Sequence, residues 1–201
     1  KNKHKGQMND YYNSSATYKN RYQLHDSILA DLKNRSILYY EFGVAGGDMI
    51  RHWSSQNTSK ESRFVGFDSF EGLPESWEDK NKSHFDQKGI FPDIPDPRVS
   101  FVKGWFQDTV YKTLAQSTFD KQCIFHLDAD LFSSTLYVLF QLQPKLKSDD
   151  IIIFDEFSSH EHEFRALEIF KKCCNNQWEF QFLGAVNNYR QVAFILKPNL
   201  E

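Results

Sequence analysis

Short, nearly continuous apolar segments recur along most of the chain, and helix-compatible stretches separate them. The apolar segments are Ile37 to Phe42, Arg63 to Phe67, Val99 to Val102, Cys123 to Leu127 and Ile151 to Phe154. Such segments are typical of strands buried on both faces of a parallel sheet. The stretches predicted to be helical are Asp48 to Ser55, Thr109 to Gln116, Ser134 to Gln143 and Glu161 to Cys174. This alternation predicts βαβ units with right-handed crossovers.

The last part of the chain follows a different pattern. Trp178 to Leu183 and Val192 to Leu196 read as strands, and the segment between them is too short for a helix, so we expect an antiparallel hairpin. Five parallel strands followed by such a hairpin form a Rossmann-like α/β fold, the seven-stranded sheet of class I methyltransferases. A dinucleotide-binding domain more often ends on a sixth parallel strand. We predict one domain over residues 1–201.

Charge and hydropathy exclude several kinds of partner. The formal net charge is −3 without a basic stripe, so we expect no nucleic-acid partner. No apolar run reaches about 18 residues, which predicts no membrane segment. The polar start of the chain lacks the apolar stretch of a signal peptide, and Lys1, Lys3 and Lys5 are predicted to belong to a frayed tail.

The cysteines indicate a reducing compartment. There are three of them, an odd number, and two are neighbours: Cys123, Cys173 and Cys174. Adjacent cysteines form no ordinary unstrained bridge with each other, so we expect a cytoplasmic protein. The sequence leaves the oligomeric state open, a homo-oligomer included.

One long segment, residues 71–97, interrupts the alternation. It is rich in proline and glycine and also contains Trp77, Phe85 and Phe91. Long irregular loops in compact domains are usually either functional or disordered. Because disordered linkers are depleted in aromatic residues, the rings favour an ordered lid.

A glycine-rich turn and an acidic residue mark the first half of a candidate site. The turn, Glu41 to Gly47, follows the first strand and opens a helix, where glycines allow close approach of a ligand and free N–H groups are available. Its spacing differs from the dinucleotide fingerprint, and a plain tight turn is the alternative. Asp68 ends the second strand, where a carboxylate is placed to accept ribose hydroxyls; a helix cap or surface turn is the alternative.

The third strand is followed by Gly104, Trp105 and Phe106. In this fold that position borders an adenine pocket, and a ring there would stack on the base. Core packing is an equal alternative for Trp105. The candidate residues for binding the methyl donor S-adenosylmethionine are therefore Glu41, Gly43, Gly46, Gly47, Asp68, Ser69, Gly104, Trp105, Phe106 and Asp128.

Acidic residues end the fourth and fifth strands and mark the second half of the site. Asp128 follows the fourth strand, and Asp155 and Glu156 follow the fifth. Two carboxylates about 4 Å apart repel by roughly 4 kcal/mol at an effective dielectric of 20, so three would need protons or a cation. Oxygen ligands suit Mg²⁺ or another hard divalent ion, which would bind and acidify a substrate hydroxyl. The alternative is a metal-free site whose other acids cap helices.

Two histidines and a serine-threonine run follow the acids. His160 and His162 are candidates for a general base or an additional ligand, with a surface position as the alternative. With Asp128, they are the candidate catalytic residues. Residues 133–135 are candidates for substrate contact, but we expect them to cap the next helix.

Together these segments resemble the macrocin-type O-methyltransferase family, which acts on sugar hydroxyls of macrolides. The matching segments are Glu41 to Val44, Phe67 to Pro74, Leu127 to Thr135 and Ile151 to Phe157. The resemblance implies a Mg²⁺-dependent methyltransferase with Asp128, Asp155 and Glu156 as metal ligands.

The chain departs from the family pattern at three places. The usual Asp-Asp-Tyr after the fifth strand is residues 155–157 here, Asp-Glu-Phe, and Asp149-Asp150 replaces a Gly-Gly turn. The related catechol enzymes carry a lysine base three residues after the first metal ligand, where this chain has Leu131.

We therefore expect a metal-assisted O-methyltransferase for a sugar or phenolic hydroxyl. A metal-independent methyltransferase with His160 or His162 as base is one alternative. A noncatalytic module that binds S-adenosylmethionine is another. A nicotinamide dehydrogenase is disfavoured by the glycine spacing.

Overall fold

A single twisted sheet of eight strands forms the centre of the molecule. The computed structural model describes residues 16–186 and 189–199. The strand order is β1-β7-β8-β6-β5-β2-β3-β4. The strands of the central run β6-β5-β2-β3-β4 pair in parallel, whereas β8 pairs antiparallel with both β6 and β7.

The elements occur in the following chain order. They are β1 (Thr17–Tyr18), α2 (Arg21–Leu32), β2 (Ile37–Phe42), α3 (Asp48–Gln56), β3 (Arg63–Asp68), β4 (Val99–Lys103), α4 (Phe106–Gln116), β5 (Gln122–Leu127), α5 (Phe132–Leu142), a 3-10 turn (Gln143–Lys145), β6 (Ile151–Phe154), α6 (Glu163–Cys173), β7 (Trp178–Val186) and β8 (Val192–Pro198). Each helix after β2 lies between two strands, as the alternation predicted.

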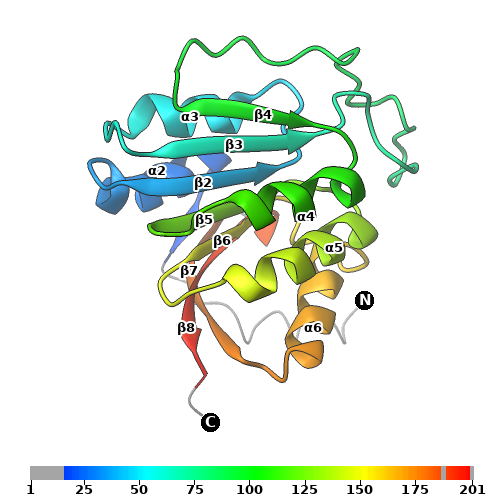
Figure 1. The fold of residues 1–201 in the computed structure, drawn as a ribbon. Helices are drawn as coiled ribbons and strands as arrows, with labels where there is room; N and C mark the ends of the chain where they lie inside the picture. The colour runs from blue at the N-terminus through cyan, green and yellow to red at the C-terminus, as the bar shows by residue number, and fades with distance from the viewer. Residues whose placement is uncertain (1–15, 187–188, 200–201) are drawn as a thin grey trace.

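Helices cover both faces of the sheet, which explains why its central strands are largely apolar. Helices α2 and α3 lie on one face, and α4, α5 and α6 lie on the other (Figure 1). All six residues of β2 are buried. Alternate side chains point to opposite faces, so Tyr39 packs with the α2 and α3 side and Tyr40 with the α4 to α6 side.

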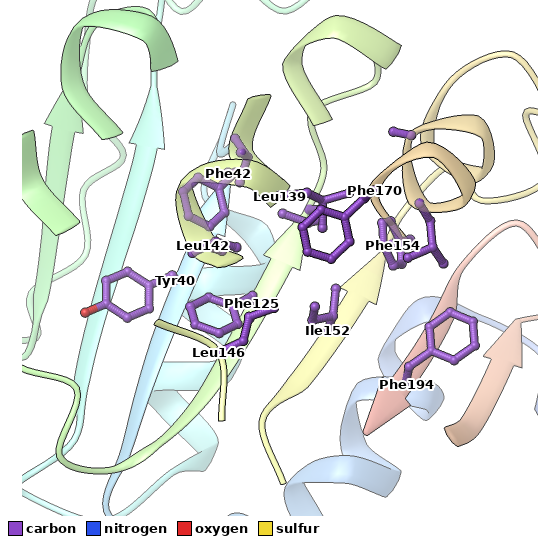
Figure 2. Close-up of a cluster of buried hydrophobic side chains, with 14 of the residues drawn as sticks. Tyr40, Phe42, Phe125, Leu139, Leu142, Leu146, Ile152, Phe154, Phe170 and Phe194 are labelled. Atoms are coloured by element: carbon purple, nitrogen blue, oxygen red, sulfur yellow. The ribbon is translucent and has the colours of Figure 1, made fainter. Parts of the chain in front are cut away.

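The larger core lies under α4, α5 and α6 and is built mainly from rings and leucines (Figure 2). Phe42 of β2 stacks on Phe67 of β3 with ring centroids 5.0 Å apart. Leu139 and Leu142 of α5 are fully buried above the sheet. Burying each such side chain stabilises the fold by about 1.5–3 kcal/mol, so this layer fixes the strand ends that carry the site.

The predicted hairpin is confirmed, and the predicted strand count is corrected. β7 and β8 pair antiparallel, with Glu179 opposite Lys197. The sheet has eight strands rather than seven because Thr17 and Tyr18 add a short parallel strand beside β7.

The sequence prediction also omitted α2. Its buried residues include Leu24, Ile28 and Leu32, which recur at helical spacing, and the side chain of Asn20 accepts a hydrogen bond from the Gln23 amide at its start. These signals were present, but buried His25 and the polar residues between them weaken the apolar pattern.

The segment between β3 and β4 is long, irregular and described throughout. It contains two isolated bridges, between Glu71 and Asp86 and between Trp77 and Lys80. Trp77 is buried, and the ammonium of Lys80 lies 3.8 Å from its ring centroid.

Further sequence expectations concern the cysteines, membrane-spanning segments and the N-terminal lysines. The three cysteines are unpaired in the structure. Within residues 16–186 and 189–199, no helix combines the length and apolar character of a membrane span. The lysines predicted to form a frayed tail lie outside the described residues.

Candidate active site

A cavity of about 320 Å³ opens at the carboxyl ends of the parallel strands. It is walled by residues that follow five of them, so both predicted halves of the site face one space. The lining residues that the sequence predicted are Glu41, Gly43, Gly46, Asp68, Ser69, Gly104, Trp105, Phe106, Asp128, Asp155 and Glu156. The volume is in the range of small-molecule pockets.

Two glycines of the first turn are needed for different reasons. Gly43 has φ +96°, and a Cβ there would lie 1.8 Å from the carbonyl oxygen of Asp128. Gly47 has φ +80°, and a Cβ there would lie 2.7 Å from the Pro92 side chain. Gly43 therefore lets the turn approach the end of β5, whereas Gly47 packs against the long loop and is the one predicted turn glycine that does not line the cavity.

Asp68 anchors the glycine-rich turn. Its Oδ2 atom accepts hydrogen bonds from the Val44 and Ala45 amides at 2.7 and 2.8 Å, and its Oδ1 atom accepts one from the Phe70 amide at 2.7 Å. Hydrogen bonds to a charged group contribute about 1.5–3 kcal/mol each. The carboxylate thus organises the backbone around the cavity that it lines, and its contact with a ribose stays a prediction.

The rings after β4 differ in their surroundings. Trp105 precedes α4, lines the cavity and is 37% exposed, so it is not a core residue. Phe106 also lines the cavity, and it packs edge-on against Phe42 with centroids 6.1 Å apart. Trp105 is therefore available to a ligand in the cavity, and stacking on an adenine stays a prediction.

Strand register explains why two of the predicted ligands meet. Leu127 of β5 pairs with Phe154 of β6, so Asp128 and Asp155 are the next residues of neighbouring parallel strands. The Nη2 atom of Arg21 lies 2.9 Å from Oδ2 of Asp155 and 3.9 Å from Oδ2 of Asp128. A guanidinium from α2 thus already neutralises the pair.

The surroundings of the two carboxyls shift their pKa values in opposite directions. Burial opposes the charge of both, but His126 and Arg21 hold the pKa of Asp155 below its usual value. Burial and the neighbouring charge of Asp155 raise the pKa of Asp128 well above its usual value. Asp155 is therefore the more acidic of the two carboxyls, and Gln191 also donates a hydrogen bond to it.

Glu156, the third predicted ligand, is bound elsewhere. Nε of Arg190 donates to both of its carboxylate oxygens at 3.2 Å, and Nη2 donates to Oε1 at 2.6 Å. Its own amide donates to Oε2 of buried Glu163 at 2.8 Å. Glu156 lines the cavity, but its carboxylate is committed to Arg190.

A buried polar network lies beneath the acids. Oε2 of Glu41 accepts a hydrogen bond from the Tyr39 hydroxyl at 2.7 Å, and that hydroxyl lies 3.0 Å from Nδ1 of His126. Nε2 of His126 lies 3.5 Å from Oδ1 of Asp155. Burial lowers the pKa of His126, but Asp155 and Glu41 outweigh burial and raise it to about 10.

A ligand set different from the predicted one emerges from this geometry. Ligand atoms of His126, Asp128 and Asp155 lie within 4.8 Å of one another, with His126 in place of Glu156. The sequence analysis did not single out His126 because it lies inside β5, where a buried polar residue is usually interpreted as part of the packed core.

Asp130 is a second residue that the sequence prediction did not single out. It lines the cavity, and no described residue forms a hydrogen bond with its carboxyl group. Burial, together with the charges of Glu156 and Asp155, raises its pKa to about 7. Its φ of +56° is unusual for a residue other than glycine. The Asp-x-Asp spacing was the available signal, because one strand end presents both residues.

The predicted histidines lie away from the cavity wall. His162 precedes α6, and its Nδ1 accepts a hydrogen bond from the Phe132 amide at 3.3 Å. The His160 ring packs edge-on against Phe164 with centroids 5.8 Å apart. Neither is among the residues that line the cavity.

The serine-threonine run corrects another expectation. Helix α5 begins at Phe132, so residues 133–135 lie inside its first turn and do not cap it. Ser134 lines the cavity, while Ser133 Oγ donates to Glu75 of the long loop at 3.3 Å.

The long loop closes one side of the cavity. Its wall residues are Gly72, Leu73, Pro74, Trp77, Lys80, His84 and Phe85. Besides the contact of Ser133 with Glu75, Ser159 Oγ donates to Glu78 at 3.5 Å. The loop thus contributes to the cavity wall, and its role as a lid stays a prediction.

The strand order, the C-terminal hairpin and the cavity at the carboxyl edge define a class I methyltransferase fold. The solved structures that it resembles share this fold. The calicheamicin methyltransferase CalS11 matches with a TM-score of 0.62 and 19% identity over 88% of this chain and 80% of that one. The O-methyltransferase NovP matches with a TM-score of 0.63 and 19% identity over 87% and 79%.

The chain belongs to the macrocin-O-methyltransferase (TylF) family, whose model matches residues 36–180. A tetracenomycin-C 4'-O-methyltransferase from Streptomyces olivaceus, acting on a dimethoxy-rhamnosyl compound by its name, is 27% identical over 113 residues, 45% of this chain and 40% of that protein. Demethyldecarbamoylnovobiocin O-methyltransferase from Streptomyces niveus is 34% identical over 65 residues, 32% of this chain and 23% of that protein. The matches thus span less than half of either relative.

Proposed function

We propose that the chain is an S-adenosylmethionine-dependent O-methyltransferase that acts on a hydroxyl of a small sugar-containing or phenolic natural product. The observation that carries the proposal is one cavity that joins the Asp68-anchored turn and Trp105 to the carboxyls of Asp128, Asp130 and Asp155. By their names, one relative methylates a rhamnosyl-tetracenomycin and another methylates demethyldecarbamoylnovobiocin, which supports the substrate class.

S-adenosylmethionine supplies the methyl group when bound, and the chain's own residues do the remaining work. The turn at residues 43–46 and the ring of Trp105 bind and orient the donor. Asp130 accepts the proton of the substrate hydroxyl, because its carboxylate faces the cavity without a hydrogen-bond partner among the described residues. Holding the hydroxyl oxygen in line with the methyl group supplies much of the rate.

We extend the proposal to a divalent cation that assists the methyl transfer. His126, Asp128 and Asp155 would hold it, since their ligand atoms converge within 4.8 Å. A cation there would acidify and orient the substrate hydroxyl. Because one ligand is an imidazole, Mn²⁺ deserves testing beside Mg²⁺. A metal-independent reaction is the alternative, because arginines already neutralise the acids.

The loop at residues 71–97 is part of the proposal as a lid. Its contacts to the body include the two serine-glutamate hydrogen bonds at Glu75 and Glu78, and the serines there are exposed or partly exposed. Because such exposed hydrogen bonds contribute little free energy, the loop can move away from the cavity easily. Limited proteolysis should cut the loop more slowly when S-adenosylmethionine is present, and an unchanged rate would argue against a lid.

A cytoplasmic, reducing location is proposed from the unpaired cysteines.

The test measures donor binding before activity. Calorimetry with S-adenosylmethionine should give saturable binding, and a screen of glycosides and phenols with methyl-labelled donor should give a methylated product. Absence of donor binding would remove the proposal. Binding without turnover on any acceptor would favour a noncatalytic module.

A further inference from the structure

Arg21 stands where a cation shared by Asp128 and Asp155 would have to bind. It is the first residue of α2, and its guanidinium contacts Asp155 at 2.9 Å and Asp128 at 3.9 Å. A divalent ion held by both carboxylates binds oxygens at about 2.0–2.6 Å and therefore lies between them. The guanidinium and the ion would compete for the same oxygen lone pairs and would repel each other.

The cavity around Arg21 is rich in acidic side chains. Nε2 of fully buried His126 lies 3.5 Å from Asp155. Seven acidic residues line the cavity, against three lysines and arginines. The convergence of ligand atoms of His126, Asp128 and Asp155 within 4.8 Å and the excess of acidic residues together point to a cation that would take the place of Arg21.

We propose that Arg21 is a tethered counter-ion of the Asp128–Asp155 pair and that a divalent cation binds only when its guanidinium leaves. This inference rests on the cation in the proposed function. In it, Arg21 sets the metal affinity of the site and keeps the two carboxylates together when the metal is absent.

The position of Arg21 suits a group that moves. Its side chain is 33% exposed, and within the described part of the chain it pairs only with these two carboxylates. The helix itself is held by Asn20 at its start and by Leu24, Ile28 and Leu32 in the core. The guanidinium can therefore turn toward solvent while the backbone of α2 stays in place.

Arg190 provides a contrast within the same cavity. It also pairs with an acid, but through three contacts between 2.6 and 3.2 Å, and its partner Glu156 is outside the converging ligand set. Removing Arg190 should not open the metal position, whereas removing Arg21 should.

The experiment titrates Mn²⁺, with Mg²⁺ as a second probe, into the intact chain without substrate and follows binding by calorimetry. Arg21→Gln should bind Mn²⁺ at least about tenfold more tightly than the wild type, because a competing positive charge is gone. Arg21→Lys, which keeps a charge, should stay close to the wild type. Arg63→Gln, an exposed arginine away from the cavity, is the matched control and should change nothing.

Several outcomes decide the question. Equal or weaker Mn²⁺ binding by Arg21→Gln would overturn the proposal, as would Mn²⁺ binding by neither protein at millimolar concentration. Tighter binding that disappears in Arg21→Gln/Asp155→Asn would support it and locate the ion. Titration of each variant with S-adenosylmethionine reports folding of the donor site and tests the proposed function separately, since that function fails only if donor binding is absent from the wild type.

Discussion

Arg190 pairs with Glu156 through two guanidinium nitrogens: Nε lies 3.2 Å from both carboxylate oxygens, and Nη2 lies 2.6 Å from Oε1. Glu156 stands where the family pattern has a second aspartate. The additional methylene and the pairing with Arg190 place the Glu156 carboxylate outside the cluster of His126, Asp128 and Asp155 that could hold a metal ion. His126, one strand away, takes its place among the converging ligands.

Glu156 is therefore predicted to be dispensable for metal binding. Glu156→Gln should leave Mn²⁺ affinity within about twofold of the wild type, whereas Asp155→Asn should weaken it by about tenfold or more, as loss of a direct ligand does. Calorimetric titration of both variants checks this. Equal losses in the two variants would return Glu156 to the ligand set.

Asp68 is predicted to matter for folding as well as for the donor. Asp68→Ala removes the acceptor of the Val44, Ala45 and Phe70 amides. We expect unfolding free energy to fall by about 2–4 kcal/mol and donor affinity to fall by about 1.5–3 kcal/mol. Urea denaturation without ligand and calorimetry with S-adenosylmethionine measure the two effects. A loss of donor affinity at full stability would mean that ribose binding is its only role.

Two glycines of the turn provide a matched pair. Gly43→Ala places a Cβ against the Asp128 carbonyl at positive φ, whereas a Cβ at Gly46 meets no atom within 4 Å. Gly43→Ala should lower unfolding free energy by more than about 2 kcal/mol, and Gly46→Ala should change it by less than about 0.5 kcal/mol. Thermal unfolding of both variants compares them, and similar midpoints would contradict the close approach.

Asp130 is predicted to be the proton acceptor. Asp130→Asn keeps the shape of the side chain but removes its basicity, so kcat should fall by about 10²–10⁴-fold. Binding of S-adenosylmethionine should be nearly unchanged. Once a methyl acceptor is known, steady-state kinetics with labelled donor measure kcat of the wild type and the variant. A variant that keeps more than about a tenth of the wild-type kcat would show that another group accepts the proton.

Asp150 gives a pH dependence that is separate from the cavity. Its carboxylate accepts hydrogen bonds from the Cys123 and Lys147 amides at 2.9 Å, but burial dominates and raises its pKa from 3.8 to about 6. Because its pKa is higher in the folded than in the unfolded protein, the protonated Asp150 side chain favours the folded state. This contribution to the free energy of unfolding is fully present below pH 3.8 and is lost as the pH rises through about 6.

The measurement follows unfolding free energy by urea denaturation from pH 4 to 7. The wild type should lose on the order of 2 kcal/mol more than Asp150→Asn over this range, since one pKa unit corresponds to about 1.4 kcal/mol. Parallel pH profiles of the two proteins would show that Asp150 is not the titrating group.

Much of this architecture follows from local pattern. Uninterrupted apolar segments such as Ile37 to Phe42 can be buried only between two layers of helices, so the parallel sheet was predictable. The hairpin was predictable because the segment between β7 and β8 is too short for a crossover. Helix α2 was missed because its apolar spacing is diluted by polar residues, among them the buried His25.

The sequence by itself determined that Asp68, Asp128 and Asp155 would meet at one edge, because each follows a parallel strand and parallel strands share their carboxyl edge. Only the tertiary structure decided which partner each acid takes. Arg21 reaches Asp155 across 134 positions, and Arg190 reaches Glu156 across 34. Such pairings depend on how α2 and the β7–β8 hairpin pack against the sheet, and no local periodicity encodes that arrangement.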